Sequence, residues 1–226
     1  MNGAAVDTHP THECLGLAAL LRRSLSGVDL TPLYQSLLQR AENDPNDACA
    51  LLDASLILQF RGSPDNALRL QQEALKLQRC FRLPAKQPVT LRVLALVAPG
   101  PVMANVPIEC LLEDSDVELT LCYAAPDGPV PSACPDHDVL FVAIGEWEAN
   151  RPLLDSWSAR LATWPKPVLI DPRAIPRVAR DTAARLLHGR PGVVMPPTRR
   201  IARQALQLAA RGIAHADALA SVGFPL

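Results

Sequence analysis

Two prolines close together, in the run Pro84-Ala85-Lys86-Gln87-Pro88, divide the chain into parts with different periodicities. Before them, apolar residues recur at every third or fourth position, a pattern typical of amphipathic helices. After them, short apolar runs alternate with helical stretches. Because such prolines interrupt regular structure, we predict a helical domain over residues 1–83, a linker over 84–88 and a different module beyond it.

The helical part has the start signals of several helices, and we predict four between residues 12 and 83. Thr31 precedes a proline and is expected to cap one of them, and Ser63 to cap another. The last two, over 47–60 and 64–80, flank a turn at Gly62. This pair resembles a tetratricopeptide repeat, with small residues at Ala67 and Ala74, and the resemblance implies a protein partner for a repeat-like cap.

Four apolar segments follow, separated by helical stretches. The nearly continuous runs over 91–98 and 139–144 predict strands buried on both faces of a parallel sheet. The alternation over 117–123 predicts a half-exposed edge strand, and residues 168–170 supply a fourth. We therefore expect an α/β fold, with a doubly wound, mostly parallel, Rossmann-like sheet over residues 89–172, in the strand order 2-1-3-4.

Ligands of such sheets bind where the strand order reverses, at the carboxyl ends of the first and third strands. Asn105 follows the first strand, Glu146 and Asn150 follow the third, and Asp171 ends the fourth. These four residues are the candidate substrate-binding residues. In the alternative interpretation the two asparagines cap helices, Glu146 is a solvated surface charge, and Asp171 before Pro172 only directs the chain.

Residues 173–226 are expected to be largely helical, and all the basic groups from 171 onward are arginines: nine, against three aspartates. Arg200 and Arg203 fall on the polar face of a predicted helix and are candidates for phosphate or partner contacts, although such a face is often only solvated. Without interleaved aromatic residues, nucleic acid is not an expected partner.

Several kinds of site have no signal in the sequence. The six cysteines are spread singly without a C-x-x-C pair, so we expect them to be reduced and to bind no zinc. The P-loop, the G-x-S-x-G nucleophile elbow of hydrolases and the H-E-x-x-H motif are absent. We expect no catalytic residue and no metal ligand within the chain. The apolar runs are too short to span a membrane, and a cytoplasmic location is predicted.

An ordered series of fragments resembles ATP-grasp ligases, the family of D-alanine:D-alanine ligase. The series contains Arg180-Asp181, Leu186-Leu187, the run from Gly192 to Thr198, and Gly223-Phe224-Pro225-Leu226. It corresponds to the family's lead-in helix, its "G-V-x-x-P-x-T" run and the start of an "FPLIVKP"-like strand. The resemblance covers residues 90–226, and Thr182 stands where the family often has lysine.

The resemblance implies that residues 173–226 lead into a nucleotide-binding core that lies outside the chain. That core would bind ATP and magnesium, and this chain would bind no cofactor itself. The chain would then be the non-catalytic N-terminal part of a carboxylate-amine or related ligase, contributing binding of a small-molecule or peptide acceptor. The alternative hypothesis is a non-enzymatic interaction module, in which the helical region binds a protein and the α/β domain is a scaffold.

Overall fold

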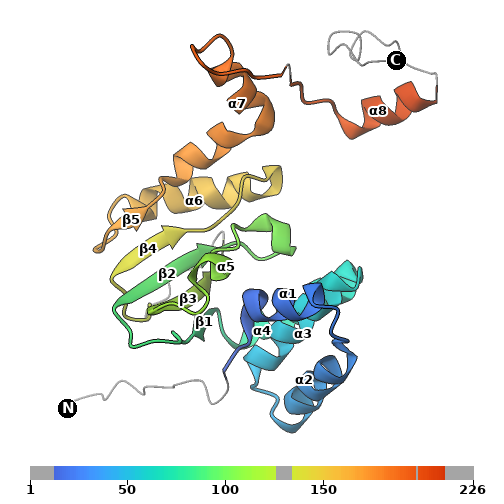
Figure 1. Ribbon diagram of the computed structural model, residues 1–226, viewed down its shortest axis with the longest axis vertical. Coiled ribbons are helices and arrows are strands. Elements are labelled where there is room, and N and C mark those ends of the chain that lie inside the picture. The colour runs from blue at the N-terminus through green and yellow to red at the C-terminus, as the bar shows by residue number, and fades with distance from the viewer. Residues whose placement is uncertain (1–12, 126–133, 197, 212–226) are drawn as a thin grey trace. The chain divides into compact units, whose positions relative to one another are not determined.

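The computed structural model describes residues 13–125, 134–196 and 198–211 of the 226-residue chain. The chain divides into two compact units, residues 1–173 and 174–226 (Figure 1). The segment 84–88 lies inside the first unit, in which helices and strands share one hydrophobic core. This unit is an α/β structure with a five-stranded mixed sheet.

Four helices precede the sheet, as predicted. α3 is the central one, because nine of its thirteen residues are buried and apolar side chains occur all around it. Leu20 of the first helix and Leu37 of the second belong to the cluster that packs against α3. The bounds are α1 Gly16–Leu25, α2 Thr31–Asn43, α3 Ala48–Phe60 and α4 Pro64–Leu77.

The caps of these helices differ from the prediction. Thr31 is the first residue of α2, and its hydroxyl donates to Asp29 Oδ1 instead of accepting from the helix backbone. Ser63 occupies the N-cap position of α4, but its hydroxyl oxygen accepts from the Asn66 side chain. Asp47 is a true cap, since its Oδ1 accepts from the Ala50 N–H at 2.8 Å.

The sheet has the strand order β1-β3-β2-β4-β5, in which only β1 is antiparallel to its neighbour. The predicted order 2-1-3-4 of the four parallel strands is therefore confirmed. The predicted edge position of residues 117–123 is wrong, because β1, which the sequence predicts to be the end of the helical domain, pairs outside that strand. The bounds are β1 Cys80–Leu83, β2 Leu91–Val97, β3 Val117–Tyr123, β4 Val139–Val142 and β5 Val168–Leu169.

One face of the sheet packs against the N-terminal helices. Val93, Ala95 and Val97 of β2 share a buried cluster with Leu52 of α3 and Leu75 of α4. Leu94 and Leu96 of β2 point to the opposite face, as the period of a strand requires, and are equally buried. The burial of residues 93–97 on both faces explains the unbroken apolar run at these positions.

The other helical elements of the first unit are short, apart from α6. Within α6, Leu154 and Trp157 are buried, and the Trp157 indole N–H donates to the Ala125 carbonyl just beyond β3. These elements are η1 Val102–Ala104, α5 Glu109–Leu112, η2 Glu148–Asn150 and α6 Arg151–Leu161. A further short helix, η3 Pro172–Val178, begins in the first unit and ends in the second.

The second unit contains α7, Arg180–Leu187, and α8, Arg203–Ala210. Arg200 was expected on the polar face of a helix together with Arg203, but it precedes α8 and pairs with Asp181 at 3.6 Å. The predicted strand at Gly223–Leu226 lies outside the described residues. No helix in the described part of the chain has both the length and the hydropathy to cross a membrane.

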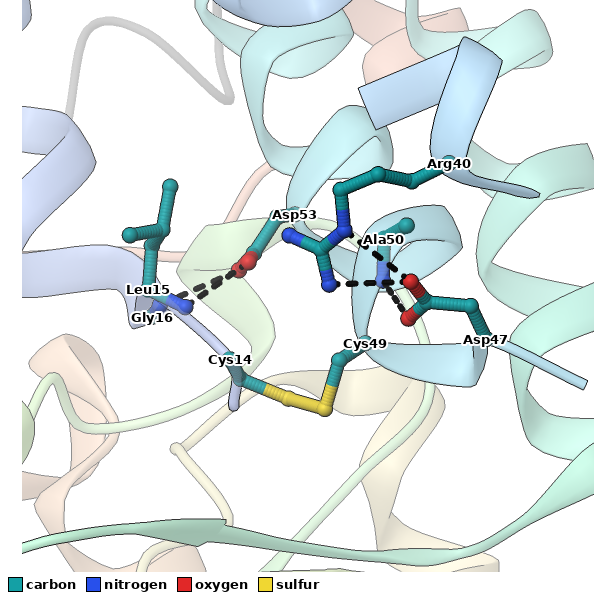
Figure 2. The surroundings of a disulfide bond; sticks show 8 residues. All are labelled: Cys14, Leu15, Gly16, Arg40, Asp47, Cys49, Ala50 and Asp53. Atoms are coloured by element: carbon teal, nitrogen blue, oxygen red, sulfur yellow. Dashed lines mark hydrogen bonds and ion pairs between the residues drawn. A yellow bond between two sulfur atoms is a disulfide. The ribbon is translucent and has the colours of Figure 1, made fainter. Parts of the chain in front are cut away.

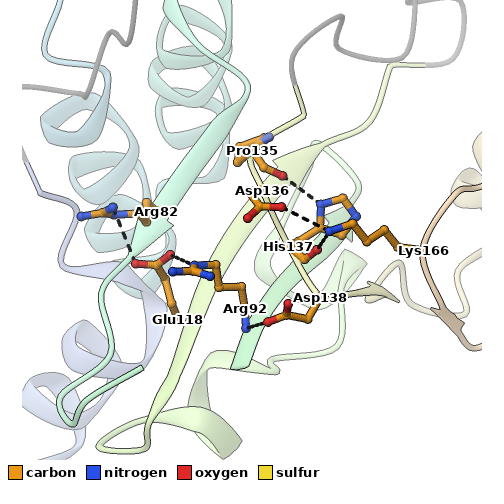
Figure 3. Close-up of polar contacts among 8 residues, drawn as sticks. All are labelled: Arg82, Arg92, Glu118, Pro135, Asp136, His137, Asp138 and Lys166. Carbon is orange, nitrogen blue, oxygen red and sulfur yellow. Dashed lines mark hydrogen bonds and ion pairs between the residues drawn. The ribbon is translucent and has the colours of Figure 1, made fainter. Parts of the chain in front are cut away.

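Polar contacts join the strands at the amino end of β4 (Figure 3). Asp138 accepts from the Arg92 backbone N–H at 2.8 Å. The imidazole of His137 is buried, with Nδ1 2.8 Å from the Pro135 carbonyl oxygen and Nε2 accepting from the Trp164 indole N–H at 3.1 Å. Lys166 donates to the His137 carbonyl and pairs with Asp136. This cluster fixes the start of β4 and uses its polar groups internally.

Candidate functional site

The loops after β2 and β4 lie against each other at the carboxyl end of the sheet. The Val106 N–H donates to the Ala143 carbonyl at 2.7 Å, and the Gly145 N–H donates to the Ala104 carbonyl at 2.8 Å. This is the position at which a parallel sheet of this order binds ligands. The structure thus brings together Asn105 and Asn150, two of the residues that the sequence nominates.

Both asparagine side chains bind backbone groups of these loops. Asn105 Oδ1 accepts from the Ala98 N–H at 2.7 Å, and its Nδ2 donates to the Ala98 carbonyl at 2.8 Å. The Asn150 Nδ2 donates to Ala104 at 2.7 Å and to Gly145 at 3.0 Å. The expected capping roles are wrong: α5 begins four residues after Asn105, and Asn150, although at the N-cap position of α6, makes no side-chain capping bond to its described backbone.

We expect Asn150→Ala to lower the free energy of unfolding by about 2 kcal/mol. Asn150 is only 4% exposed, and its loss leaves two buried carbonyls with fewer donors. Asn66→Ala is the matched control, because Asn66 is exposed and should change stability by about 0.5 kcal/mol or less. Urea denaturation followed by circular dichroism measures both. Equal effects of the two substitutions would contradict the structural role of Asn150.

The N-terminal helices also hold the loop after β2. The side-chain amide of Gln71 in α4 accepts from the Gly100 N–H at 2.7 Å and donates to its carbonyl at 3.0 Å. Gln59 of α3 accepts from the Val102 N–H at 2.7 Å. Since each contact involves loop backbone, the conformation of this edge depends on the helical layer.

Two apolar side chains are exposed at this edge, next to a half-buried glutamate. Met103 is 87% exposed and Trp147 45% exposed, and Glu146 directly precedes the tryptophan. The two loops are adjacent here, because a Cβ on Gly100 would lie 3.9 Å from the Trp147 ring. The edge therefore presents a mixed apolar and acidic surface on a backbone held by internal hydrogen bonds.

Asp171 has a local role after β5. Its carboxylate accepts from the Arg173 backbone N–H at 2.9 Å and forms a paired contact with the Arg173 guanidinium, at 3.0 and 2.8 Å. A bidentate arginine contact of this kind is strongly directional. Asp171 thus directs the chain after the strand, as the structural interpretation of Asp171-Pro172 predicts.

A second polar cluster, which the sequence does not identify, surrounds the start of α1. Asp53 of α3 accepts from the N–H groups of Leu15 and Gly16 at 2.7 and 3.0 Å (Figure 2). Glu109 accepts from those of Leu17 and Ala18 at 2.6 and 3.4 Å. Two carboxylates from distant positions thus satisfy four N–H groups at the first turn of α1, which has no side-chain cap of its own.

A disulfide lies beside this cluster, between Cys14 before α1 and Cys49 in α3 (Figure 2). The expectation that all six cysteines are reduced is therefore wrong. Cys14 and Cys49 are 35 positions apart in the sequence, and only the packing of α1 against α3 brings them together. The remaining cysteines, Cys80, Cys110, Cys122 and Cys134, are free thiols.

The environment of the two carboxylates favours their protonated forms. Burial raises the pKa of Asp53 to about 6, against the lowering effect of the two backbone N–H donors. Burial also raises the pKa of Glu109 to about 7, and the nearby charge of Asp53 adds to the shift. Glu109 lines both a cavity of about 50 Å³ on the β2-loop side and a pocket of about 260 Å³ between α1, α5 and the chain after β1.

The two carboxyl groups of this second cluster can take up protons, and they hold the start of α1 through its backbone N–H groups. The carboxylates are occupied by backbone donors, and the described residues contain no group of three or more potential metal ligands. No protein-family model, curated protein or solved structure matches the chain.

Proposed function

We propose that the chain is the non-catalytic N-terminal part of an ATP-grasp ligase, and that the carboxyl edge of its sheet contributes to binding of the acceptor substrate. The observation that carries the proposal is the strand order. It brings the loops after β2 and β4 side by side, and Glu146 belongs to the second of these loops. In open α/β sheets that edge is the usual ligand position.

The internal hydrogen bonds of the edge support a binding role. Asn105, Asn150 and Gln71 hold the backbone of both loops, so little ordering would be needed when a ligand contacts Glu146 or Trp147. Preorganisation of this kind strengthens binding by reducing its entropic cost. A glutamate beside an aromatic ring suits a small acceptor that carries an amine.

The remaining parts of the proposal follow from the resemblance. ATP and magnesium would bind a core that follows this region in the natural protein, and Arg200 and Arg203 would contact phosphate or a partner. The same proposal includes a Rossmann-like sheet, helices that form a tetratricopeptide-like repeat, and a cytoplasmic location.

A binding titration tests the acceptor site. We expect amino acids or dipeptides to change the tryptophan fluorescence of the 226-residue chain saturably, without need of magnesium-ATP. Glu146→Gln should weaken this binding by about tenfold, the loss of one charge-assisted contact, whereas the exposed Glu148→Gln should leave it unchanged. No saturable signal across the panel would remove the support for an acceptor site at this edge.

Two further measurements test the ligase assignment. The intact mass of the natural protein, captured from its source cells, should exceed the 24.4 kDa of this chain by the mass of a nucleotide-binding core. The isolated chain should neither bind magnesium-ATP nor hydrolyse it. Turnover of ATP by these 226 residues would contradict the non-catalytic assignment.

The exposure of Met103 and Trp147 favours a second candidate function, that of a protein-interaction module. Exposed aromatic and methionine side chains are enriched at the centres of protein interfaces. In that case Trp147→Ala would abolish capture of a protein partner from the source cells, and small amines would not compete. The two candidate functions are therefore distinguished by whether a small amine or a protein binds this edge of the sheet.

A further inference from the structure

Two of the free cysteines face each other across the edge of the sheet. Cys80 of β1 and Cys122 of β3 are directly opposed in the antiparallel register, and their sulfur atoms lie 2.9 Å apart. The pair is separate from the Cys14–Cys49 disulfide and from the carboxyl edge of the sheet. Neither the binding role proposed above nor the packing of the core requires two thiols at these positions.

The backbone geometry of this pair is suited to a disulfide. The Tyr123 N–H donates to the Arg79 carbonyl at 2.8 Å, so Arg79 and Tyr123 form a hydrogen-bonded pair. Such pairs alternate along an antiparallel ladder, which makes Cys80 and Cys122 a non-hydrogen-bonded pair, with Cα atoms about 4.5 Å apart. That separation lies within the range of about 4.4–6.8 Å seen in disulfides. A bond between the two sulfurs would need little movement of either strand.

The two thiols differ in access and in acidity. Cys80 is half-buried on the edge strand, whereas Cys122 is 2% exposed. The hydrogen bond with Cys122, aided by the charge of Arg79, lowers the pKa of Cys80. The same hydrogen bond, together with burial, raises the pKa of Cys122. Cys80 is thus the accessible, more easily ionised thiol, and Cys122 is placed to react only with Cys80.

We propose that Cys80 and Cys122 form a reversible thiol-disulfide site that exchanges with small-molecule disulfides such as oxidised glutathione. The Cys80 thiolate attacks one sulfur of the small disulfide, whose S–S bond breaks and releases one thiolate. Cys122 then loses its proton and attacks the Cys80 sulfur of the mixed disulfide, which expels the second thiolate. The protein loses two hydrogen atoms, and one small disulfide is reduced to two thiols.

Oxidation of this site would add a covalent link within the sheet, at the strand that follows α4. β1 follows α4 after two residues and is paired with the sheet through only four residues. The new bond would tie this short edge strand covalently to β3 and close the chain between positions 42 apart. The oxidised protein should therefore unfold at a higher temperature than the protein reduced at this pair alone.

The experiment uses the whole 226-residue protein, fully reduced and then equilibrated in glutathione buffers of increasing oxidised fraction. Remaining thiols are alkylated, and the peptides are mapped by mass spectrometry. We expect a Cys80–Cys122 linked peptide to appear and to disappear again on return to reduced buffer. In the native reduced protein, Cys80 should be alkylated at least about tenfold faster than Cys122.

Single substitutions distinguish the roles of the two thiols. Cys122→Ser should accumulate a glutathione adduct on Cys80, whereas Cys80→Ser should leave Cys122 unmodified. Cys110→Ser, at the exposed cysteine of α5, is the control and should leave the link unchanged. The proposal is overturned if no linked peptide forms at any buffer ratio, if Cys80 links to Cys134 instead, or if Cys122 reacts first.

Discussion

Gly16→Ala is expected to lower the free energy of unfolding by about 3 kcal/mol, the sum of backbone strain and a steric clash. Gly16 has a φ of 79°, in the left-handed region that disfavours side chains. A Cβ at this position would lie 2.6 Å from Glu109 Oε2 and 3.0 Å from a methyl group of Leu83. Accommodating it would displace the carboxylate that accepts from Leu17, so the start of α1 would lose a partner as well.

Gly27→Ala is the matched control for this substitution. Gly27 has nearly the same φ, 74°, but no atom of the described residues lies within 4 Å of its Cβ position. It should therefore show only the backbone cost, about 1 kcal/mol. Chemical denaturation of both variants, with the Cys14–Cys49 disulfide intact, measures the difference. Equal losses for the two variants would show that the close approach of Glu109 to position 16 adds nothing to the cost of a side chain there.

The order of helices and strands was predictable because it is encoded in local periodicity. The four helices, the buried strands over 91–98 and 139–144 and the order of the parallel strands all follow from apolar spacing and crossover rules. β1 was missed because its four residues follow a helix after only two residues and lie directly before Pro84, which leaves no room for a periodic pattern. That omission led to the wrong edge position of the strand over 117–123.

The location of the candidate site was predictable, but the function of its side chains was not. Asn105 and Asn150 occur at the expected edge, yet their amides bind loop backbone, and a single sequence does not distinguish such an amide from a ligand contact. Glu109 could be recognised as a residue in the first turn of a short helix. Its actual partners, the N–H groups at the start of α1, are 92 and 91 positions away.

The stability of the first unit should fall as the pH rises from about 4 to about 8, through ionisation of Asp53 and Glu109. In the folded protein their pKa values are about 6 and about 7, against ordinary values of 3.8 and 4.5. The folded state therefore binds these protons more tightly than the unfolded chain. The resulting stabilisation is complete below the ordinary values and is lost as the pH rises through the folded ones.

Substitution by neutral amides isolates this contribution. Each pKa unit corresponds to about 1.4 kcal/mol, so Asp53 should account for at most about 3 kcal/mol of the decline and Glu109 for at most about 3.5 kcal/mol. In Glu109→Gln the urea midpoint should fall less between pH 5 and pH 8 than it does in the wild type, while Glu42→Gln, at an exposed position of α2, should follow the wild type. Asp53→Asn should shift the remaining transition to lower pH, because the charge of Asp53 helps to raise the pKa of Glu109. If the wild type and Glu109→Gln have parallel profiles over this range, the pKa of Glu109 is not raised in the folded protein, and its ionised carboxylate holds the start of α1.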